Sequence, residues 1–289
     1  MINFQFSTLR YRFKALNSFR PPYFLGSAFR GVMGRGLKKT VCIKPFEECS
    51  KCEFNRTCPY TVIFETEQFL NQPSKYVMKP PYEKKELKEG DELHLEITLL
   101  GETSDYWEFI TASFSGVINL GKERYIKLQS VEYLHPFQQE YYPIKNSFSR
   151  FDAYHFFELV TRKSSLIVQI YPTSIKVKNS FVKASQFNKD IFVKSVISRV
   201  SKVALSYGIK EKKIFIDRDR FDITYSRLHP SPMKRWSNRK GKHMTIPAFE
   251  GFAKLEGDLS QIYPLLSLIE VINLGKSVSF GLGRVEIIS

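Results

Sequence analysis

The two halves of this chain carry the same order of apolar patterns, and this repetition limits the fold more than any other feature. In the first half, alternation of apolar and polar residues predicts strands at 2–16, 91–100 and 124–134, because successive side chains of a strand point to opposite faces. Apolar residues at helical spacing predict helices at 24–41 and 106–120. This order approximates strand–helix–strand–strand–helix–strand, the split βαβ arrangement.

The second half repeats that order. It predicts a strand at 165–172, a helix at 186–207, strands between 213 and 255, a helix at 259–274 and a last strand that ends the chain. We therefore expect an α+β protein built from two similar domains. A sheet of this plan is antiparallel with helices on one face, which leaves its other face free to meet a ligand.

A polar, proline-bearing segment separates the halves. We expect an N-terminal domain at 1–135 with a cysteine-rich insertion at 42–60, a linker at 136–150, and a C-terminal domain at 151–289. Apolar residues make up 43% of the chain, which is enough for a proper core. There is no run of 18 apolar residues and no signal-peptide pattern at the N-terminus, so we expect a cytoplasmic protein.

The charge is strongly basic and unevenly placed. The chain has 44 Lys and Arg against 29 Asp and Glu, a net charge of +15. Met1–Phe46 contains nine Lys or Arg and no acid, and Arg227–His243 contains six and no acid. We expect a nucleic-acid partner rather than an anionic membrane, because no strongly amphipathic basic helix stands out. Solvated basic faces are the alternative interpretation.

All four cysteines lie in one short stretch, at Cys42, Cys49, Cys52 and Cys58. A reducing cytoplasm disfavours disulfides, whereas four thiolates at this spacing can surround a tetrahedral zinc ion. An iron–sulfur cluster and no metal at all are the alternatives. Four protein ligands would leave no position for a water nucleophile, so we expect a structural Zn site and no catalytic metal.

Leu228–Met244 mixes basic residues with an aromatic one. Lys and Arg side chains bind phosphates, and an interleaved tryptophan can stack on an exposed base. A solvated loop whose tryptophan folds back onto the core is the alternative. The RNA-binding candidates of this loop are Lys234, Arg235, Trp236, Arg239 and Lys242.

Asn273–Ile288 connects the last helix to the last strand and is rich in glycine. Its glycines continue into the expected strand, where a glycine usually marks a bulge or the close approach of another backbone. That backbone could belong to the protein or to a ligand. The residues of interest are Gly275, Lys276, Gly281, Gly283 and Arg284.

These motifs together resemble a known family. The run KRWSNRKGKHMTIPAFEGFAKLEGDL, then a predicted helix, then LGKSVSFGLGRVEI, is similar to the C-terminal half of the sixth family of CRISPR-associated (Cas) proteins. Members of that family are endoribonucleases that cut precursor CRISPR RNA within its repeats. In the N-terminal half, FRGVMGRGLKKTVC and the cysteines after it resemble the glycine-rich helix and cysteine insertion of one branch of the family.

The resemblance implies a fold, a reaction and a partner. The fold is two tandem ferredoxin-like, RRM-like βαββαβ domains with a Cys-rich insertion in the first. The partner is CRISPR repeat RNA, which the glycine-rich loop and its Lys276 and Arg284 would approach. The reaction needs no metal: the ribose 2′-OH attacks the adjacent phosphate and leaves a 2′,3′-cyclic phosphate and a 5′-OH. Such a step needs a base, an acid and cations around the phosphorane.

The catalytic residues depart from the family pattern. Many members use a histidine in or beside the first helix, whereas the first histidine here is His94. The first helix is instead basic on one side, where Arg30 joins the RNA-binding candidates. The candidate catalytic residues are Lys38, Lys39, His243, Arg35 and Tyr23.

Two other functions stay open. The missing early histidine favours a non-catalytic subunit that binds repeat RNA in a CRISPR effector complex. A zinc-containing RNA-binding protein of another purpose is the third hypothesis.

Overall fold

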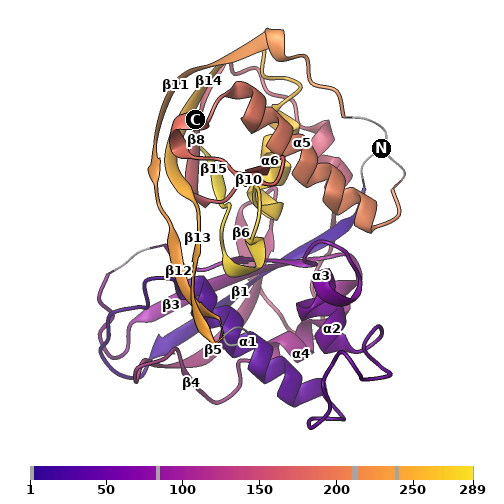
Figure 1. Ribbon diagram of the computed structural model, residues 1–289, viewed down its shortest axis with the longest axis vertical. Helices are drawn as coiled ribbons and strands as arrows, with labels where there is room; N and C mark the ends of the chain where they lie inside the picture. The colour runs from indigo at the N-terminus through magenta and orange to yellow at the C-terminus, as the bar shows by residue number, and fades with distance from the viewer. Residues whose placement is uncertain (1–2, 83–84, 210–213, 238–240, 289) are drawn as a thin grey trace. The chain divides into compact units, whose positions relative to one another are not determined.

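The N-terminal unit, Gln5–Phe151, is built on an antiparallel sheet with the first strand of the chain at its centre (Figure 1). The computed structural model describes residues 3–82, 85–209, 214–237 and 241–288. From one edge to the other the strands are β2 (Tyr76–Lys79), β3 (Glu92–Leu100), β1 (Gln5–Ala15), β5 (Tyr125–His135) and β4 (Val117–Asn119). The order of β2, β3, β1 and β5 is that of the split βαβ arrangement.

Strand β1 shows how the sequence pattern sets the two faces of this sheet. Tyr11 and Phe13 are fully buried, whereas Arg10 and Arg12, which alternate with them, point to the opposite face. Helix α1 (Leu25–Val41) covers the apolar face, and the ring of its Phe29 lies 5.3 Å from that of Phe13. The basic residues of β1 are thus held on the face opposite the helices.

Shorter helices complete this unit. They are α2 (Pro59–Phe64), α3 (Thr66–Phe69), α4 (Trp107–Ala112) and a 3-10 helix at Gly101–Tyr106. Helix α1 approaches both α2 and α4 closely. A Cβ atom added to Gly34 would lie 2.3 Å from the Phe64 ring, and one added to Gly36 would lie 2.2 Å from the Ser113 carbonyl oxygen. The glycines that weaken α1 as a helix therefore permit this packing.

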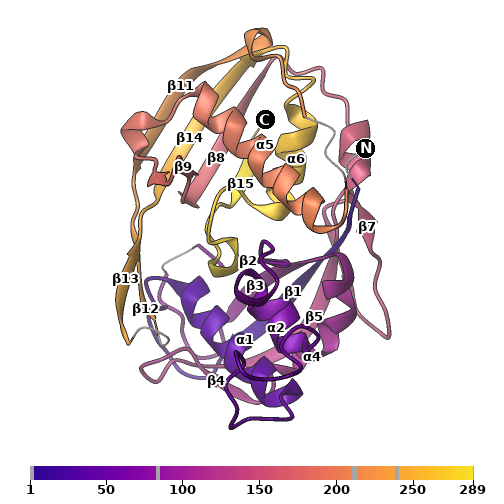
Figure 2. The same cartoon turned by 45° about the vertical axis from the view of Figure 1, so that its right-hand side comes forward.

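The C-terminal unit, Asp152–Ser289 with Met1–Phe4, repeats the plan. Its sheet order is β11 (Phe221–Pro230), β14 (Phe249–Gly257), β8 (Ser165–Thr173) and β15 (Val285–Ile288), all antiparallel. Helices α5 (Lys189–Ser206) and α6 (Tyr263–Ile272) lie side by side against this sheet (Figure 2). Fully buried residues of the strands and helices form the core, among them Val168, Ile170, Val200, Leu266 and Ile269.

Two small hairpins leave the C-terminal sheet. Strands β12 (Met233–Ser237) and β13 (Lys242–Ile246) extend β11 and β14 beyond a proline-containing bend (Figure 1). Strands β9 (Lys176–Val177) and β10 (Ser180–Phe181) form the other hairpin, between β8 and α5. Strand β7 (Phe151–Asp152) pairs with β1, and 3-10 helices lie at Ala153–Glu158, Ala184–Gln186, Arg218–Arg220 and Val278–Phe280.

The tandem α+β arrangement agrees with the sequence prediction, and two segments differ. The helix expected at 106–120 is α4 alone, because Gly116 adopts a left-handed φ of 73° and β4 follows at once. The expected linker at 136–150 instead contributes β6 (Glu140–Pro143), which pairs with β5. Tyr133 and Tyr142 are opposite one another in this pair, with their rings 5.6 Å apart, and such a cross-strand contact stabilises the pairing. In the described ranges, no helix is both long and apolar enough to cross a membrane.

Candidate nucleic-acid interface

The glycine-rich loop of the C-terminal unit begins where α6 ends. The buried Arg199 of α5 donates to the carbonyl oxygens of Ile272 and Asn273, at 2.8–3.2 Å. The last carbonyl groups of a helix have no N–H donor within the helix, so the buried guanidinium supplies the hydrogen bonds that they need. The Asn273 side chain in turn donates to the carbonyl of Leu282 across the loop, at 3.0 Å. Arg199 was not predicted from the sequence, where its only signal is a charged residue on the apolar side of a helix.

The loop glycines allow segments of the protein's own backbone to approach one another closely. Gly275 and Gly283 have left-handed φ values of 78° and 82°. A Cβ atom at Gly275 would lie 2.4 Å from the Ser174 carbonyl oxygen, and one at Gly283 would lie 1.9 Å from that of Leu274. Strand β15 begins only at Val285, so the expectation that the glycines continue into the strand was wrong. Left-handed residues at Gly281 and Gly283 cannot form a regular strand. Contact of the loop with RNA stays a prediction.

The two predicted basic residues of the loop differ in their partners. Arg284 donates to the Glu286 carboxylate at 2.8 Å from its Nε, and it stacks on the Tyr171 ring at 4.9 Å. Lys276 is exposed, and no ion pair forms at it within the described ranges. Burial lowers the pKa of Lys202 on α5, and the neighbouring charges of Lys276 and Arg199 lower it further. Lys202 and Lys276 therefore form a basic pair that the sequence analysis did not find.

The β12–β13 hairpin has two faces with different surroundings. Trp236 and His243 are paired across the strands, with their rings 5.0 Å apart, and Trp236 is 50% exposed. Lys234, two residues before Trp236, shares that face and is exposed. On the opposite face, the Arg235 guanidinium lies 4.4 Å from the centre of the Phe280 ring. Arg235 thereby attaches the hairpin to the glycine-rich loop.

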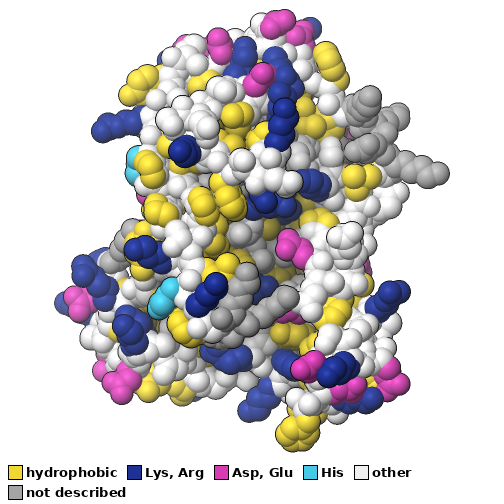
Figure 3. Space-filling view, in the orientation of Figure 1, with side chains coloured by type: hydrophobic (Ala, Val, Ile, Leu, Met, Phe, Trp, Pro, Cys, Tyr) yellow, Lys and Arg dark blue, Asp and Glu magenta, His cyan; other side chains and the backbone are white. Residues whose placement is uncertain are grey.

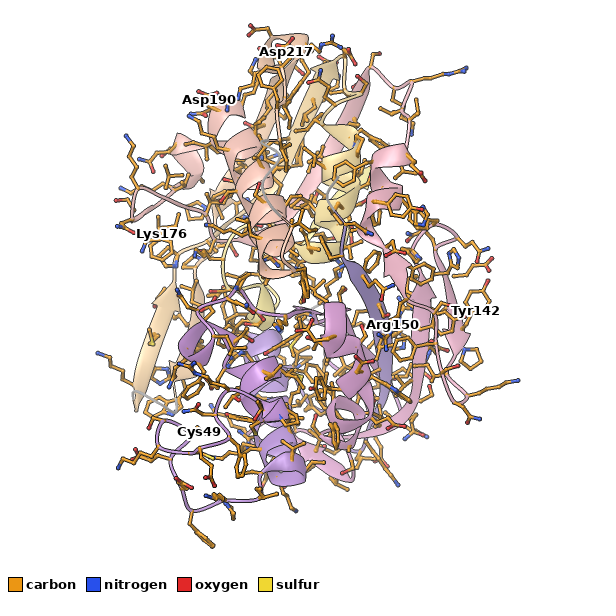
Figure 4. The ribbon with its side chains drawn as sticks, turned by 90° about the vertical axis from the view of Figure 1, so that its right-hand side faces the viewer. Cys49, Tyr142, Arg150, Lys176, Asp190 and Asp217 are labelled. Atoms are coloured by element: carbon orange, nitrogen blue, oxygen red, sulfur yellow. The ribbon has the colours of Figure 1, made fainter. Side chains whose placement is uncertain are left out.

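Lys242 and Arg239 are the remaining RNA-binding candidates of this hairpin. Lys242 is exposed on β13 opposite Ser237, whereas Arg239 lies outside the described residues. Figure 3 shows Lys and Arg side chains on the visible surface of each unit, and acidic side chains at the top of the view as well as in its lower part. Asp190 and Asp217 occupy that end of the C-terminal unit in Figure 4. Other acids of this unit lie elsewhere, since Glu250 contacts His229 and Glu286 contacts Arg284 of the glycine-rich loop.

Helix α1 carries most of the candidate catalytic residues. Arg35 and Lys39 are exposed, and Lys38 is half-buried with its Nζ 5.9 Å from the centre of the Tyr60 ring. Tyr23, just before the helix, is 53% exposed. The structure thus gathers four of the five candidates in the N-terminal unit, while His243 belongs to the C-terminal unit.

Arg30 has a packing role in the same helix. Its guanidinium lies 4.0 Å from the centre of the Phe64 ring, and it donates to the Phe64 carbonyl oxygen at 3.3 Å. This contact helps to hold α1 against α2, next to the close approach of Gly34 to the Phe64 ring. RNA binding by Arg30 is not needed to explain its position.

The basic face of the N-terminal sheet is largely neutralised. Arg10 donates to Glu96 at 2.7 Å and stacks on the Tyr141 ring at 3.3 Å. Burial alone raises the pKa of the Glu96 carboxyl, but the charge of Lys79 and hydrogen bonds from Tyr141 and Arg10 outweigh it and leave that pKa below its ordinary value. Arg12 likewise donates to Glu132 at 2.8 Å. The acid-free stretch Met1–Phe46 therefore does not form a continuous basic surface.

The four cysteines lie on the loop between α1 and α2. Cys42 directly follows α1, Cys58 directly precedes α2, and Figure 4 marks Cys49 between them. All four are free and partly buried. In the part of the chain that the structure describes, no group of three or more His, Cys, Asp or Glu is placed to hold a metal ion. The donor chemistry suits zinc, but the site is not assembled here, so zinc binding stays a prediction.

Comparison with known proteins assigns both units. Residues 4–150 match a family model described as an N-terminal domain, and residues 168–285 match the model of the CRISPR-associated endoribonuclease Cas6. Residues 168–285 therefore form a Cas6-family domain. The Cas6 match contains the glycine-rich loop and the β12–β13 hairpin. A search of curated proteins found no match.

Solved Cas6 structures share the tandem ferredoxin-like fold. A chain of a partial Cas6-RT-Cas1–Cas2 complex matches with a TM-score of 0.61 and 14% identity over 99% of this chain. A Cas6 product complex matches with a TM-score of 0.58 and 12% identity, covering 98% of this chain and 99% of the other. Thermus thermophilus Cas6 gives 0.57 and 11%, covering 99% of both chains. This chain spans 46% and 29% of the two Cas6-RT-Cas1–Cas2 chains that it matches.

Proposed function

We propose that this protein is an endoribonuclease that cuts CRISPR repeat RNA in precursor transcripts and so produces guide RNAs. The observation that carries this proposal is the Cas6 match over residues 168–285. That segment holds the exposed Trp236 and Lys234 of the hairpin and the exposed Lys276 of the glycine-rich loop. Exposed cations beside an exposed aromatic ring suit RNA, whose phosphates and unstacked bases they can contact together.

The proposed chemistry transfers a phosphoryl group within the RNA. The 2′-oxygen loses its proton to a base and bonds to the adjacent phosphorus, while the bond from phosphorus to the 5′-oxygen breaks. The leaving 5′-oxygen takes a proton from an acid, so the products are a 2′,3′-cyclic phosphate and a 5′-OH. Cations close to the phosphate stabilise the added negative charge.

Helix α1 offers groups for the acid and the cations. Arg35, Lys38 and Lys39 have no ion pair within the described residues, so their charge is available to a phosphate. A lysine ammonium can donate the proton to the 5′-oxygen. His243 of the C-terminal unit is the remaining catalytic candidate, and an imidazole nitrogen can accept a proton. These side chains can supply protons and charge themselves, so we propose that cleavage proceeds without a metal ion.

A non-catalytic repeat-RNA-binding subunit is the alternative function. It is favoured by the surroundings of the histidines outside the hairpin. His94 contacts Glu92, His155 contacts Glu158, His229 contacts Glu250 and His135 accepts from the Gln138 amide. None of them lies on α1, where many members of the family carry a catalytic histidine. In this alternative the chain would hold repeat RNA within a CRISPR effector complex.

We also propose a structural role for the cysteine loop. Cys42, Cys49, Cys52 and Cys58 would bind one zinc ion and tie the end of α1 to the start of α2. Such a closed site adds order to a loop that has little apolar core of its own.

The decisive experiment is a cleavage assay in EDTA. The substrate is the CRISPR repeat RNA of the same genome, beside copies with a single 2′-deoxy substitution at each position. One sharp cut that a single 2′-deoxy substitution blocks, with a cyclic phosphate at the new end, would establish the proposed reaction. Tight, salt-sensitive binding without a cut would favour the non-catalytic subunit. If the protein neither binds nor cuts the repeat RNA, both functions are refuted.

A further inference from the structure

A third stretch of the chain lacks acids, and its cations are not part of the site described above. Between Glu158 and Asp190 the sequence contains six Lys or Arg and no Asp or Glu. Lys189, the last of the six, is used internally, since its Nζ donates to the carbonyl oxygens of Arg218 and Phe221 at 3.0 and 3.1 Å. Three of the other cations lie on or next to the β9–β10 hairpin: Lys176, Lys178 and Lys183.

This hairpin is small but well anchored. Ile175 and Val182 at its base are buried, and the Val182 amide donates to the Ile175 carbonyl at 3.0 Å. Its two-residue turn has positive φ at both positions, 45° at Lys178 and 67° at Asn179. This is the tight type of hairpin turn, which usually takes Asn or Gly. A lysine at the first position is unusual and projects a charge from the tip.

The exposed surface of the hairpin combines charge with an aromatic ring. Lys176, Lys178 and Lys183 are exposed, and no ion pair involves them within the described ranges. Phe181 is 43% exposed, and the Nζ of Lys176 lies 5.6 Å from the centre of its ring. Figure 4 shows Lys176 well away from the end of the unit that carries Asp190 and Asp217. A basic surface with an exposed phenylalanine is the combination found in sites for single-stranded nucleic acid.

The hairpin directly adjoins the glycine-rich loop. The Lys276 amide donates to the Ser174 carbonyl at 2.8 Å, and these two residues form an isolated β-bridge. Ser174 lies only two residues before Lys176. The β9–β10 hairpin and the part of the glycine-rich loop that carries Lys276 are therefore adjacent within the C-terminal unit.

We propose that the β9–β10 hairpin is a second RNA contact of this protein, which binds a single-stranded stretch of the transcript adjoining the segment held at the glycine-rich loop. Lys176, Lys178 and Lys183 contact phosphates, and an unstacked base stacks on Phe181. The bound stretch of RNA must be single-stranded, because a base can stack on an aromatic side chain only when it is free of a duplex. This proposal rests on the proposed function, since it extends the same RNA-binding surface.

The test compares two double variants of the full chain that remove the same charge. Lys176→Ala with Lys183→Ala alters the hairpin, and Arg162→Ala with Lys163→Ala alters exposed cations of the same acid-free stretch. Affinity for repeat RNA is measured across salt concentrations, with and without a single-stranded flank of about ten nucleotides. Each lost phosphate contact lowers the salt slope by about 0.7 for single strands. We expect a slope lower by about 1.4 for the hairpin variant on the flanked RNA, and no change for the control.

A third variant tests the stacking contact alone. Phe181→Leu keeps an apolar side chain without an aromatic face, and we expect about tenfold weaker binding of the flanked RNA. If wild-type protein binds repeat RNA while both hairpin variants bind with unchanged affinity and slope, this inference is refuted and the proposed function stands. Equal losses on flanked and unflanked RNA would refute the single-stranded assignment. If wild-type protein does not bind repeat RNA, the proposed function itself fails.

Discussion

The two units share a strand order, yet they differ in which of their positive charges are paired with acids. In the N-terminal unit, two arginines of the central strand contact acids from neighbouring strands, Arg10 with Glu96 and Arg12 with Glu132. In the C-terminal unit, the lysines of both hairpins and of the glycine-rich loop have no such partner within the described ranges. The comparison shows that an acid-free stretch of sequence does not by itself indicate a basic surface.

Arg35, Lys38 and Lys39 of helix α1 also have no ion pair within the described residues, and they give the prediction with the largest effect. Replacement of Lys38 and Lys39 by Ala should slow cleavage of repeat RNA by about 10²- to 10⁴-fold, because acid catalysis and charge stabilisation are both lost. Single-turnover kinetics with saturating protein measures the chemical step apart from binding. The matched control replaces the exposed Lys88 and Lys145 of the same unit by Ala and should cleave normally. Unchanged cleavage by the α1 variant would show that Lys38 and Lys39 are not catalytic residues.

The glycines of the two units provide the second prediction. Gly283→Ala should lower the free energy of unfolding by about 3 kcal/mol, because the residue is left-handed and its Cβ would overlap the Leu274 carbonyl. Gly121→Ala in the N-terminal unit should cost about 1 kcal/mol, since its φ is 96° but nothing lies within 4 Å of the added atom. Urea unfolding of both variants measures the difference. Similar losses for the two would show that the close approach at Gly283 matters little.

The paired cations of the N-terminal sheet should contribute to stability in a pH-dependent way. Glu96→Gln should lower the free energy of unfolding by about 2 kcal/mol at pH 7, since it removes a charged acceptor of several hydrogen bonds. The folded state depresses the pKa of Glu96, so its contribution is complete above the unfolded pKa of about 4.3 and is lost as the pH falls through the lower folded value.

Unfolding of wild type and Glu96→Gln between pH 3 and pH 7 tests this sign. The difference between the two proteins should be constant above about pH 5 and shrink below about pH 4. A difference that grows on acidification would contradict the assignment. RNA binding at neutral pH should be unaffected, in contrast to changes in the C-terminal hairpins.

The cysteine loop gives the smallest expected effect. Purified protein should contain one zinc ion per chain, and Cys49→Ser with Cys52→Ser should remove it and lower the melting temperature by a few degrees, which is about 1 kcal/mol for a unit of this size. Zinc content by mass spectrometry and thermal unfolding measure both. Cleavage at a temperature where the variant is folded should persist. Protein that is free of metal and as stable as the variant would disprove the zinc site.

Local pattern was enough for much of the fold and for part of the candidate site. Alternation and helical spacing located β1, α1, β3, β8 and α5, because burial of one face imposes these periods. The short β6 and the reduced α4 were missed, since Tyr–Tyr pairing and a left-handed glycine overrode the local signal. Among site residues, composition pointed to the β12–β13 loop but not to Arg199, Lys202 or the β9–β10 hairpin.

The sequence by itself determined the order of strands and helices, the basic balance, and the positions where only glycine fits the backbone. Only the tertiary structure decided which charges remain available to RNA. Arg10 and Glu96 are 86 residues apart in the chain, and Arg12 and Glu132 are 120 apart. Such pairs form because strand register places Arg10 opposite Glu96 and places Arg12 diagonally across from Glu132, on one face of a sheet. The lysines of the C-terminal hairpins lie beyond the edges of such a sheet, where no facing strand supplies an acid.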